Sequence, residues 1–207
     1  GKKLWIVVGE DMRLSSPSLK KRLIKGLTES GLNVVEVGLI STPTFYYAVA
    51  YYKYDGGIQV SASHNPKEYN GLKMTRASAI PVGGETGIME IKDLVVKNRF
   101  ENGEKIGKII AKNNVIQDAV KIQSIDIDTT KIKPFKIVAD AANAMGALDL
   151  EAMFSSLACD LIKLNFNLDG TFPAHHPDPL KEENLEQIKA AVLKEKADLG
   201  IAPDGDG

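Results

Sequence analysis

The sequence predicts an α/β protein made of two consecutive domains, each with a mixed β-sheet covered by helices. Short apolar runs rich in β-branched residues alternate along the chain with longer segments whose apolar residues recur at helical spacing. A linker expected at residues 126–133 separates a first unit from a second. The chain has 207 residues, 43% of them hydrophobic, which is enough for two small cores. We therefore expect domains at residues 1–128 and 129–207.

The first unit begins with a strand at residues 4–9, where the apolar run LWIVVG suits a buried position. Ser16 and Pro17 then fit the N-cap and first turn of a helix that ends near Gly31. The other elements expected in this unit are strands at 33–37 and 57–61, a hairpin or loop at 71–87, and helices at 42–53, 86–98 and 115–123. Residues 98–114 are polar, and no element is assigned to them.

The second unit begins with a strand at residues 135–140. Its further expected elements are a helix through Leu148 and Leu157, a strand at 161–164, a proline-rich loop at 169–179, a helix through Leu185 and Val192, and a strand at 199–202. The chain starts almost inside its first strand and stops directly after its last one. We interpret it as a fragment of a longer protein.

The bulk composition excludes several classes of function. The net charge is −1, and no basic patch interleaved with aromatic residues occurs, so we expect no nucleic-acid partner. No apolar run reaches membrane-spanning length, and no signal-peptide pattern opens the chain, so we expect no membrane partner. Cys159 is the single cysteine, and its apolar neighbours predict a buried, inert thiol. These features favour a cytoplasmic protein.

A first candidate site follows the strand at residues 57–61. Ligands of open α/β sheets bind outside the carboxyl ends of strands, and the segment SASHNP at 61–66 lies at such an end. It places the Ser63 hydroxyl beside the His64 imidazole. Ser, His, Asn and Pro are also common turn residues, so a plain polar turn remains an alternative at this point.

A second candidate site is the closing sequence DGDG at 204–207, which also follows a strand. Alternating glycines allow the carboxylates of Asp204 and Asp206 to converge, and hard oxygen ligands of this kind suit Mg²⁺ or Ca²⁺. A solvated turn is the alternative, because Asp-Gly is a common turn dipeptide.

Taken together, four segments resemble the α-D-phosphohexomutase superfamily, which includes phosphoglucomutase, phosphomannomutase and phosphoglucosamine mutase. The segment GGIQVSASHNPKEYNGLK at 56–73 resembles its active-site serine loop, and GEDMRLSS at 9–16 resembles an upstream element. The segment TFPAHHPDP at 171–179 is similar to the one that precedes the metal loop in the phosphomannomutase/phosphoglucomutase branch, and DGDG at 204–207 matches the start of that loop.

The resemblance implies a role for each matching residue. Ser63 would be the phosphoserine that exchanges its phosphoryl group with the sugar and would also contact the metal. Lys73 and His64 would assist proton transfer or stabilise charge, although His64 could instead only orient the loop. Arg13 would face the cleft and bind substrate phosphate, with a structural ion pair as the alternative. The metal ligands would be Asp204 and Asp206, completed by a third aspartate that this sequence does not include.

The resemblance also implies the reaction and its cofactors. The parent enzyme would interconvert hexose 1-phosphate and hexose 6-phosphate, with glucose or mannose as the sugar. It would use Mg²⁺, with hexose 1,6-bisphosphate as intermediate and activator. Its partner would be a small phosphosugar, and no oligomeric state follows. Full members have four domains, so this chain would supply the first two, the second incomplete, and would be inactive alone. The alternatives are phosphoglucosamine mutase and a non-catalytic module. His175 and His176 are expected to be cleft-lining or structural.

Overall fold

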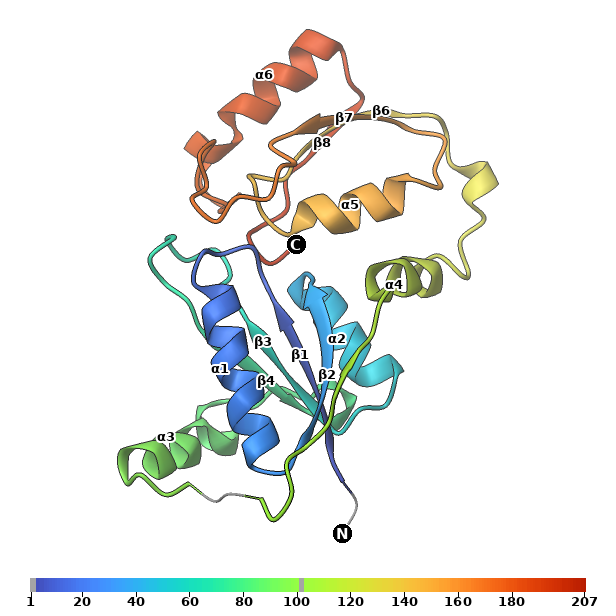
Figure 1. Cartoon of the computed structure of the whole chain (residues 1–207). Helices are drawn as coiled ribbons and strands as arrows, with labels where there is room; N and C mark the ends of the chain where they lie inside the picture. Colours follow the sequence, from blue (N-terminus) through green and yellow to red (C-terminus); the bar gives the residue numbers. More distant parts are fainter. Residues whose placement is uncertain (1–2, 101–102) are drawn as a thin grey trace.

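The computed structural model describes residues 3–100 and 103–207. Figure 1 shows two α/β units, one stacked on the other, with the C-terminal end of the chain lying at the junction between them. The hydrogen bond from the backbone N–H of Thr42 to the carbonyl of Asp206, at 3.1 Å, is one of the contacts that join the two units there. The predicted α/β class is confirmed.

The sheet of the first unit has five strands in the order β4-β3-β1-β2-β5. All neighbours are parallel except β3 and β4, which form an antiparallel pair. The strands are β1 (Trp5–Glu10), β2 (Asn33–Leu39), β3 (Gly56–Val60), β4 (Leu72–Arg76) and β5 (Ile109–Ala111). The carboxyl ends of β1, β2 and β3 therefore lie at one edge of the sheet, which faces the second unit (Figure 1).

Helices cover both faces of this sheet because successive strand residues point to opposite sides. Val7 packs in one core cluster with residues of α2, whereas Val8 packs in a second cluster with Ile24 of α1. The helices of this part of the chain are α1 (Ser16–Glu29), α2 (Thr42–Tyr51), α3 (Met89–Val96) and α4 (Val115–Gln123). Among the described residues, no helix combines the length and apolar character that a membrane span requires.

The second unit has a smaller sheet in the order β7-β6-β8, and all its strands are parallel. Its elements are β6 (Lys136–Asp140), α5 (Gly146–Phe154), β7 (Asp160–Leu164), α6 (Glu186–Glu195) and β8 (Leu199–Ile201). Figure 1 shows α5 and α6 on opposite sides of this sheet. The expectation of a mixed sheet thus holds for the first unit and is wrong for the second.

Four local expectations are corrected. The segment 98–114, to which no element was assigned, contains β5, a short strand that pairs with β2. The helix expected from residue 86 begins at Met89, because Thr86 and Gly87 have non-helical backbone angles within a preceding π-turn. The N-cap of α1 is Ser15 rather than Ser16, and its side chain makes no capping bond. Cys159 is half-buried rather than buried.

Close packing of α2 on β3 gives a test of this architecture. A Cβ atom at Gly57 would lie 2.6 Å from Val49 Cγ2 and 2.7 Å from Phe45 Cε2, so Gly57→Ala is expected to lower the free energy of unfolding by about 1–3 kcal/mol. Gly26, inside α1, has no heavy atom within 4 Å of the same position. Gly26→Ala is therefore the control and should stabilise by about 0.5–1 kcal/mol. Urea unfolding of both variants checks this, and equal effects would contradict the packing described.

Candidate active site at the junction of the two units

The candidate site forms where a loop of the first unit meets a loop of the second. The serine loop, residues 61–71, follows β3, and the acidic loop, residues 204–207, follows β8. A Cβ atom at Gly205 would lie 2.6 Å from the carbonyl oxygen of Ser63, so the backbones of the two loops are in direct contact. The two segments singled out in the sequence are thus brought together across the junction.

Ser63 lies at the turn of the serine loop in a strained conformation. Its φ is +54°, in the left-handed region that non-glycine residues adopt uncommonly. Its backbone N–H donates to Ser61 Oγ at 3.2 Å, and its own Oγ lies 3.3 Å from His64 Nδ1. His64 is exposed, and its Nδ1 is 3.8 Å from Asp204 Oδ2. The half-buried Ser63 hydroxyl is therefore presented to the junction beside an imidazole and a carboxylate.

Asp206 is the carboxylate that connects most groups of the site. Its Oδ1 accepts hydrogen bonds from Thr42 Oγ1 at 2.8 Å and Ser61 Oγ at 3.3 Å, and its Oδ2 accepts one from Lys73 Nζ. Burial alone would raise the pKa of Asp206, but hydrogen bonds from Lys73, Ser63 and Thr42 outweigh it and lower the pKa below its ordinary value. Asp206 is thus held ionised, with the Lys73 ammonium as its nearest cation.

Arg13 was expected to face the cleft, and the structure places it elsewhere. Its side chain is buried, and the guanidinium donates to four carbonyl oxygens of the serine loop at 2.7–3.0 Å: those of Ser63, Asn65, Pro66 and Tyr69. Its Nε lies 3.2 Å from Asp11 Oδ2. Burial lowers the pKa of Arg13, and the Asp11 carboxylate opposes that shift. The guanidinium thus holds the backbone of the serine loop through four carbonyl groups. These contacts support a positioning role and not the expected contact with substrate phosphate.

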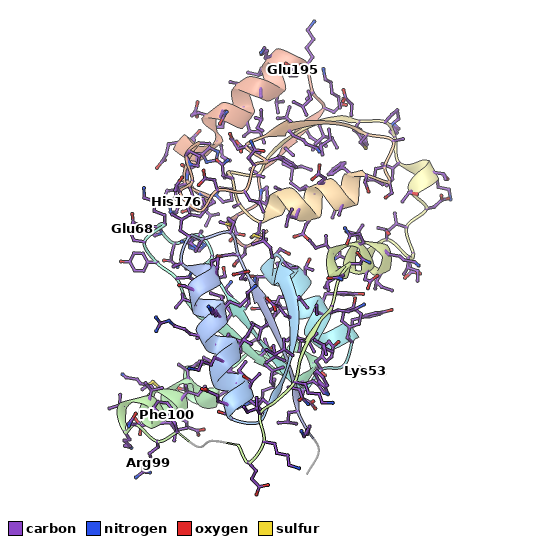
Figure 2. All side chains as sticks on the ribbon, viewed as in Figure 1. Lys53, Glu68, Arg99, Phe100, His176 and Glu195 are labelled. Atoms are coloured by element: carbon purple, nitrogen blue, oxygen red, sulfur yellow. The ribbon has the colours of Figure 1, made fainter. Side chains whose placement is uncertain are left out.

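The serine loop and the proline-rich loop of the second unit line an open pocket of about 260 Å³ beside the site. Figure 2 shows Glu68 and His176, one from each loop, on the same side of the junction. The pocket is lined by Pro66, Lys67, Glu68, Thr171, Phe172 and His176. His176 therefore lines this opening, whereas His175 is turned inward, with its Nε2 3.0 Å from Asp140 Oδ2.

Comparison with known proteins shows the family to which the chain belongs. The family description "Phosphoglucomutase/phosphomannomutase, alpha/beta/alpha domain I" matches residues 1–102, and that of domain II of the same family matches residues 116–207. The chain belongs to the phosphoglucomutase/phosphomannomutase family. The resemblance drawn from the four sequence segments is thereby confirmed.

Curated members of the phosphoglucomutase/phosphomannomutase family align with nearly all of the chain. A phosphomannomutase of Vibrio cholerae is 41% identical over 97% of this chain and 44% of the relative. A phosphomannomutase/phosphoglucomutase of Pseudomonas aeruginosa is 38% identical over 98% of this chain and 42% of the relative. The chain thus spans less than half the length of these relatives.

A solved structure shows the same fold. The crystal structure of a phosphoglucomutase/phosphomannomutase family protein from Burkholderia thailandensis superposes with a TM-score of 0.89 at 36% identity, over 99% of this chain and 45% of that one. Both units of the chain are therefore arranged as in a family member.

The metal ligands expected from the family are only partly assembled in this chain. Asp204, Asp206 and the Ser63 hydroxyl offer the hard oxygen donors that Mg²⁺ prefers. However, both Asp206 oxygens already accept hydrogen bonds, and Asp204 Oδ1 accepts one from the Asp206 backbone N–H at 3.0 Å. Across residues 3–100 and 103–207, no group of three or more His, Cys, Asp or Glu side chains could hold a metal ion. The oxygen donors of Asp204, Asp206 and Ser63 fit Mg²⁺, but these three residues need a further ligand to complete a site.

The contacts of two residues at the site are not predicted by the sequence. Thr42 was interpreted only as the start of a helix, yet its hydroxyl donates to Asp206. Phe172 lies within a family-like segment, but nothing in that segment indicated that its ring contacts Arg13, with the guanidinium carbon 5.2 Å from the ring centroid. Both contacts cross between the two units, so only the tertiary structure reveals them.

Asp149 of α5 makes a hydrogen bond across the junction, and its burial predicts a pH dependence of stability. Its Oδ1 accepts from Thr44 Oγ1 at 2.9 Å. Burial raises the pKa of Asp149, and hydrogen bonds from Ser41 and Thr44 only partly oppose this. A carboxyl whose pKa is higher in the folded than in the unfolded protein favours folding most when protonated. Its contribution therefore declines as the pH rises from the ordinary aspartate pKa through the raised folded value.

We expect Asp149→Asn to remove this dependence, because the amide oxygen can still accept from Thr44. The variant should be close to the wild type in stability near about pH 4 and more stable near about pH 7. Asp128→Asn is the control with the opposite sign, since hydrogen bonds from Thr130 and Lys131 lower the pKa of Asp128. Thermal unfolding at both pH values checks the result, and a constant difference between Asp149→Asn and wild type would contradict it.

Proposed function

We propose that this chain forms the catalytic-serine half of a phosphohexomutase that interconverts hexose 1-phosphate and hexose 6-phosphate. The observation that carries the proposal is the contact of the acidic loop with Ser63, which places carboxylates, a lysine and a histidine around one serine hydroxyl. The relatives are more than twice as long as this chain. By the full-length enzyme we mean a protein of the relatives' length that contains this chain. The sugar we propose is glucose or mannose, as in the names of the similar proteins.

In the proposed first step, phosphorylated Ser63 donates its phosphoryl group to the free hydroxyl of a bound hexose monophosphate. The bond between Ser63 Oγ and phosphorus breaks as a bond from phosphorus to the sugar oxygen forms. The sugar hydroxyl gives up its proton, and Ser63 Oγ takes one up, so that the serine hydroxyl is restored. The product is hexose 1,6-bisphosphate. The bisphosphate then reorients in the site. Its other phosphoryl group is transferred to Ser63 Oγ, which releases the isomeric monophosphate and restores the phosphoserine.

The side chains around Ser63 suit this chemistry. Phosphoryl transfer depends mainly on positioning and on stabilisation of negative charge. Lys73, which now pairs with Asp206, supplies a positive charge to the transferring group or its acceptor. His64, 3.3 Å from the Ser63 hydroxyl, exchanges the proton or orients the loop. Arg13 acts indirectly, by fixing the carbonyl groups of the serine loop.

We further propose that Mg²⁺ is held by Asp204, Asp206 and the phosphorylated Ser63, with one more ligand from the full-length enzyme. When bound, the ion would neutralise charge on the phosphoserine and on the group in transfer. Asp206 also pairs with Lys73 in this structure, so the lysine ammonium lies beside the proposed metal ligand. We also propose a cytoplasmic location, where phosphorylated sugars are metabolised.

A coupled assay tests the proposed reaction. The full-length enzyme is expected to convert glucose 1-phosphate or mannose 1-phosphate to the 6-phosphate in the presence of Mg²⁺ and a catalytic amount of the bisphosphate. This chain alone is expected to be inactive. Selective turnover of glucosamine phosphates would favour a phosphoglucosamine mutase instead. A full-length enzyme that turns over no phosphohexose would favour a non-catalytic module.

A further inference from the structure

Phe172, in the proline-rich loop at residues 169–179, has an unusual conformation for its type. Its φ is +50°, and its side chain is buried, with 9% of its surface exposed. A bulky residue in the left-handed region is an outlier and persists only where its surroundings determine it. Here the backbone N–H of Phe172 donates to the Asp169 carbonyl at 3.0 Å, and Asp169 Oδ1 accepts from the Thr171 N–H at 2.8 Å. These bonds therefore fix the backbone from which the ring projects.

The ring of Phe172 points at the guanidinium of Arg13 in the other unit. The distance from Arg13 Cζ to the ring centroid is 5.2 Å, within the range of a cation–π contact. Such contacts are stronger when water is excluded, and Arg13 is 1% exposed. Gly170 allows the approach, because a Cβ atom there would lie 2.6 Å from the Met12 carbonyl oxygen and 2.7 Å from Arg13 Cα.

The second unit holds the proline-rich loop at several points. The Asp169 N–H donates to the Asn143 carbonyl at 3.0 Å, and the Ala174 N–H donates to Asn143 Oδ1 at 3.3 Å. His175 Nε2 lies 3.0 Å from Oδ2 of Asp140, a buried residue at the end of β6. The position of the Phe172 ring is therefore set by the sheet of the second unit.

Arg13 transmits this position to the serine loop. Its Nη2 donates to the Ser63 carbonyl at 2.7 Å, so the guanidinium that lies over Phe172 also fixes the strained backbone of Ser63. We infer that Phe172 is a positioning residue, which orders the serine loop through Arg13 when the second unit docks on the first. The consequence for phosphoryl transfer rests on the proposed function, whereas the effect on the loop does not.

Amide hydrogen exchange of this chain tests the inference. Phe172→Leu keeps an apolar side chain but removes the aromatic face. The hydrogen-bonded amides of Ser63, Asn65 and Tyr69 are then expected to exchange about tenfold faster relative to the amides of β1. Phe45→Leu is the matched control, because Phe45 is equally apolar but packs in the core cluster of the first unit. Phe45→Leu should increase the exchange rates of the serine-loop amides and the β1 amides by the same factor.

Two more variants separate the loss of the aromatic ring from poor folding of the leucine variant. Phe172→Tyr retains the aromatic face, and Phe172 lines the open pocket of about 260 Å³, so wild-type exchange is expected. Phe172→Gly adopts the left-handed φ freely but lacks the ring, so it should resemble Phe172→Leu even if the leucine variant folds poorly. A ratio of loop to β1 exchange in Phe172→Leu or Phe172→Gly equal to that in Phe45→Leu would overturn the inference. So would a tyrosine variant with an equally loose loop.

Phosphorylation of the full-length enzyme separates this inference from the proposed function. Phe172→Leu is expected to slow phosphoryl uptake by Ser63 from a hexose 1,6-bisphosphate about tenfold, and Phe172→Tyr should restore it. If wild-type Ser63 takes no phosphate while loop exchange responds as described, the proposed function fails and the positioning role stands. If Ser63 is phosphorylated at the same rate in both variants and loop exchange is unchanged, the positioning role fails alone.

Discussion

Ser63→Ala is expected to lower the mutase activity of the full-length enzyme by about 10⁴-fold or more, because the substitution removes the atom that carries the phosphoryl group. The fold should be retained, since Ser63 is half-buried and its Oγ lies 3.3 Å from the exposed His64, and Asp206 keeps its hydrogen bonds from Thr42 and Lys73 when that from Ser63 is lost. The coupled assay measures the loss in activity, and thermal unfolding checks that the variant is folded.

The matched control for this loss is Ser156→Ala, an exposed serine beyond the end of α5. It makes the same chemical change outside the serine loop and the acidic loop and should leave the activity within about twofold. A Ser63→Ala enzyme that keeps a tenth or more of the wild-type rate would mean that another group accepts the phosphoryl, and the proposed role of Ser63 would be wrong.

Arg13→Ala is expected to have the largest effect on stability, lowering the free energy of unfolding by about 3–5 kcal/mol. The side chain is buried, and its loss leaves the Asp11 carboxylate without its cation and four serine-loop carbonyls without their donor. The hydrogen bonds to Asp11 from Ser16 Oγ, at 2.5 Å, and from the backbone N–H of residue 13, at 3.0 Å, do not replace that cation. Urea unfolding of the variant and the wild type measures the difference.

An exposed ion pair provides the control for Arg13. Lys25 Nζ lies 3.7 Å from Glu29 Oε1 on the surface of α1, and Lys25→Ala should cost less than about 0.5 kcal/mol. A comparable loss in both variants would argue that Arg13 contributes only as an ordinary surface charge. That result would also remove the physical basis for its positioning of the serine loop.

Much of the fold could be predicted because local signals and tertiary structure agree. The Thr42-Pro43 pair marks the start of α2, and the apolar spacing from residue 115 to 123 marks α4, whose bounds are those expected. The strand β5 could not be found this way. Its residues, Ile109–Ala111, are all exposed at the sheet edge and show no alternation, so they form a strand only because β2 is available to pair with.

The site was predictable only in its parts. Strand ends and resemblance to the mutases singled out Ser63, Asp204 and Asp206, yet the sequence spacing between them carries no information on distance. Arg13 shows where such reasoning fails. An arginine in a family-like segment suggested contact with phosphate, and no local pattern reveals that its donors are already used by backbone carbonyls. The left-handed backbone at Phe172 is equally invisible before the chain is folded.

The proposed reaction requires a serine that accepts a phosphoryl group at the junction of the two units. Peptide mass spectrometry of the full-length enzyme, after incubation with a hexose 1,6-bisphosphate and Mg²⁺, tests this most directly. We predict one phosphoryl group on the peptide that contains Ser63, at close to one per chain, and none on that peptide from the Ser63→Ala variant. Phosphate that is found only on other residues, or on none, would contradict the account.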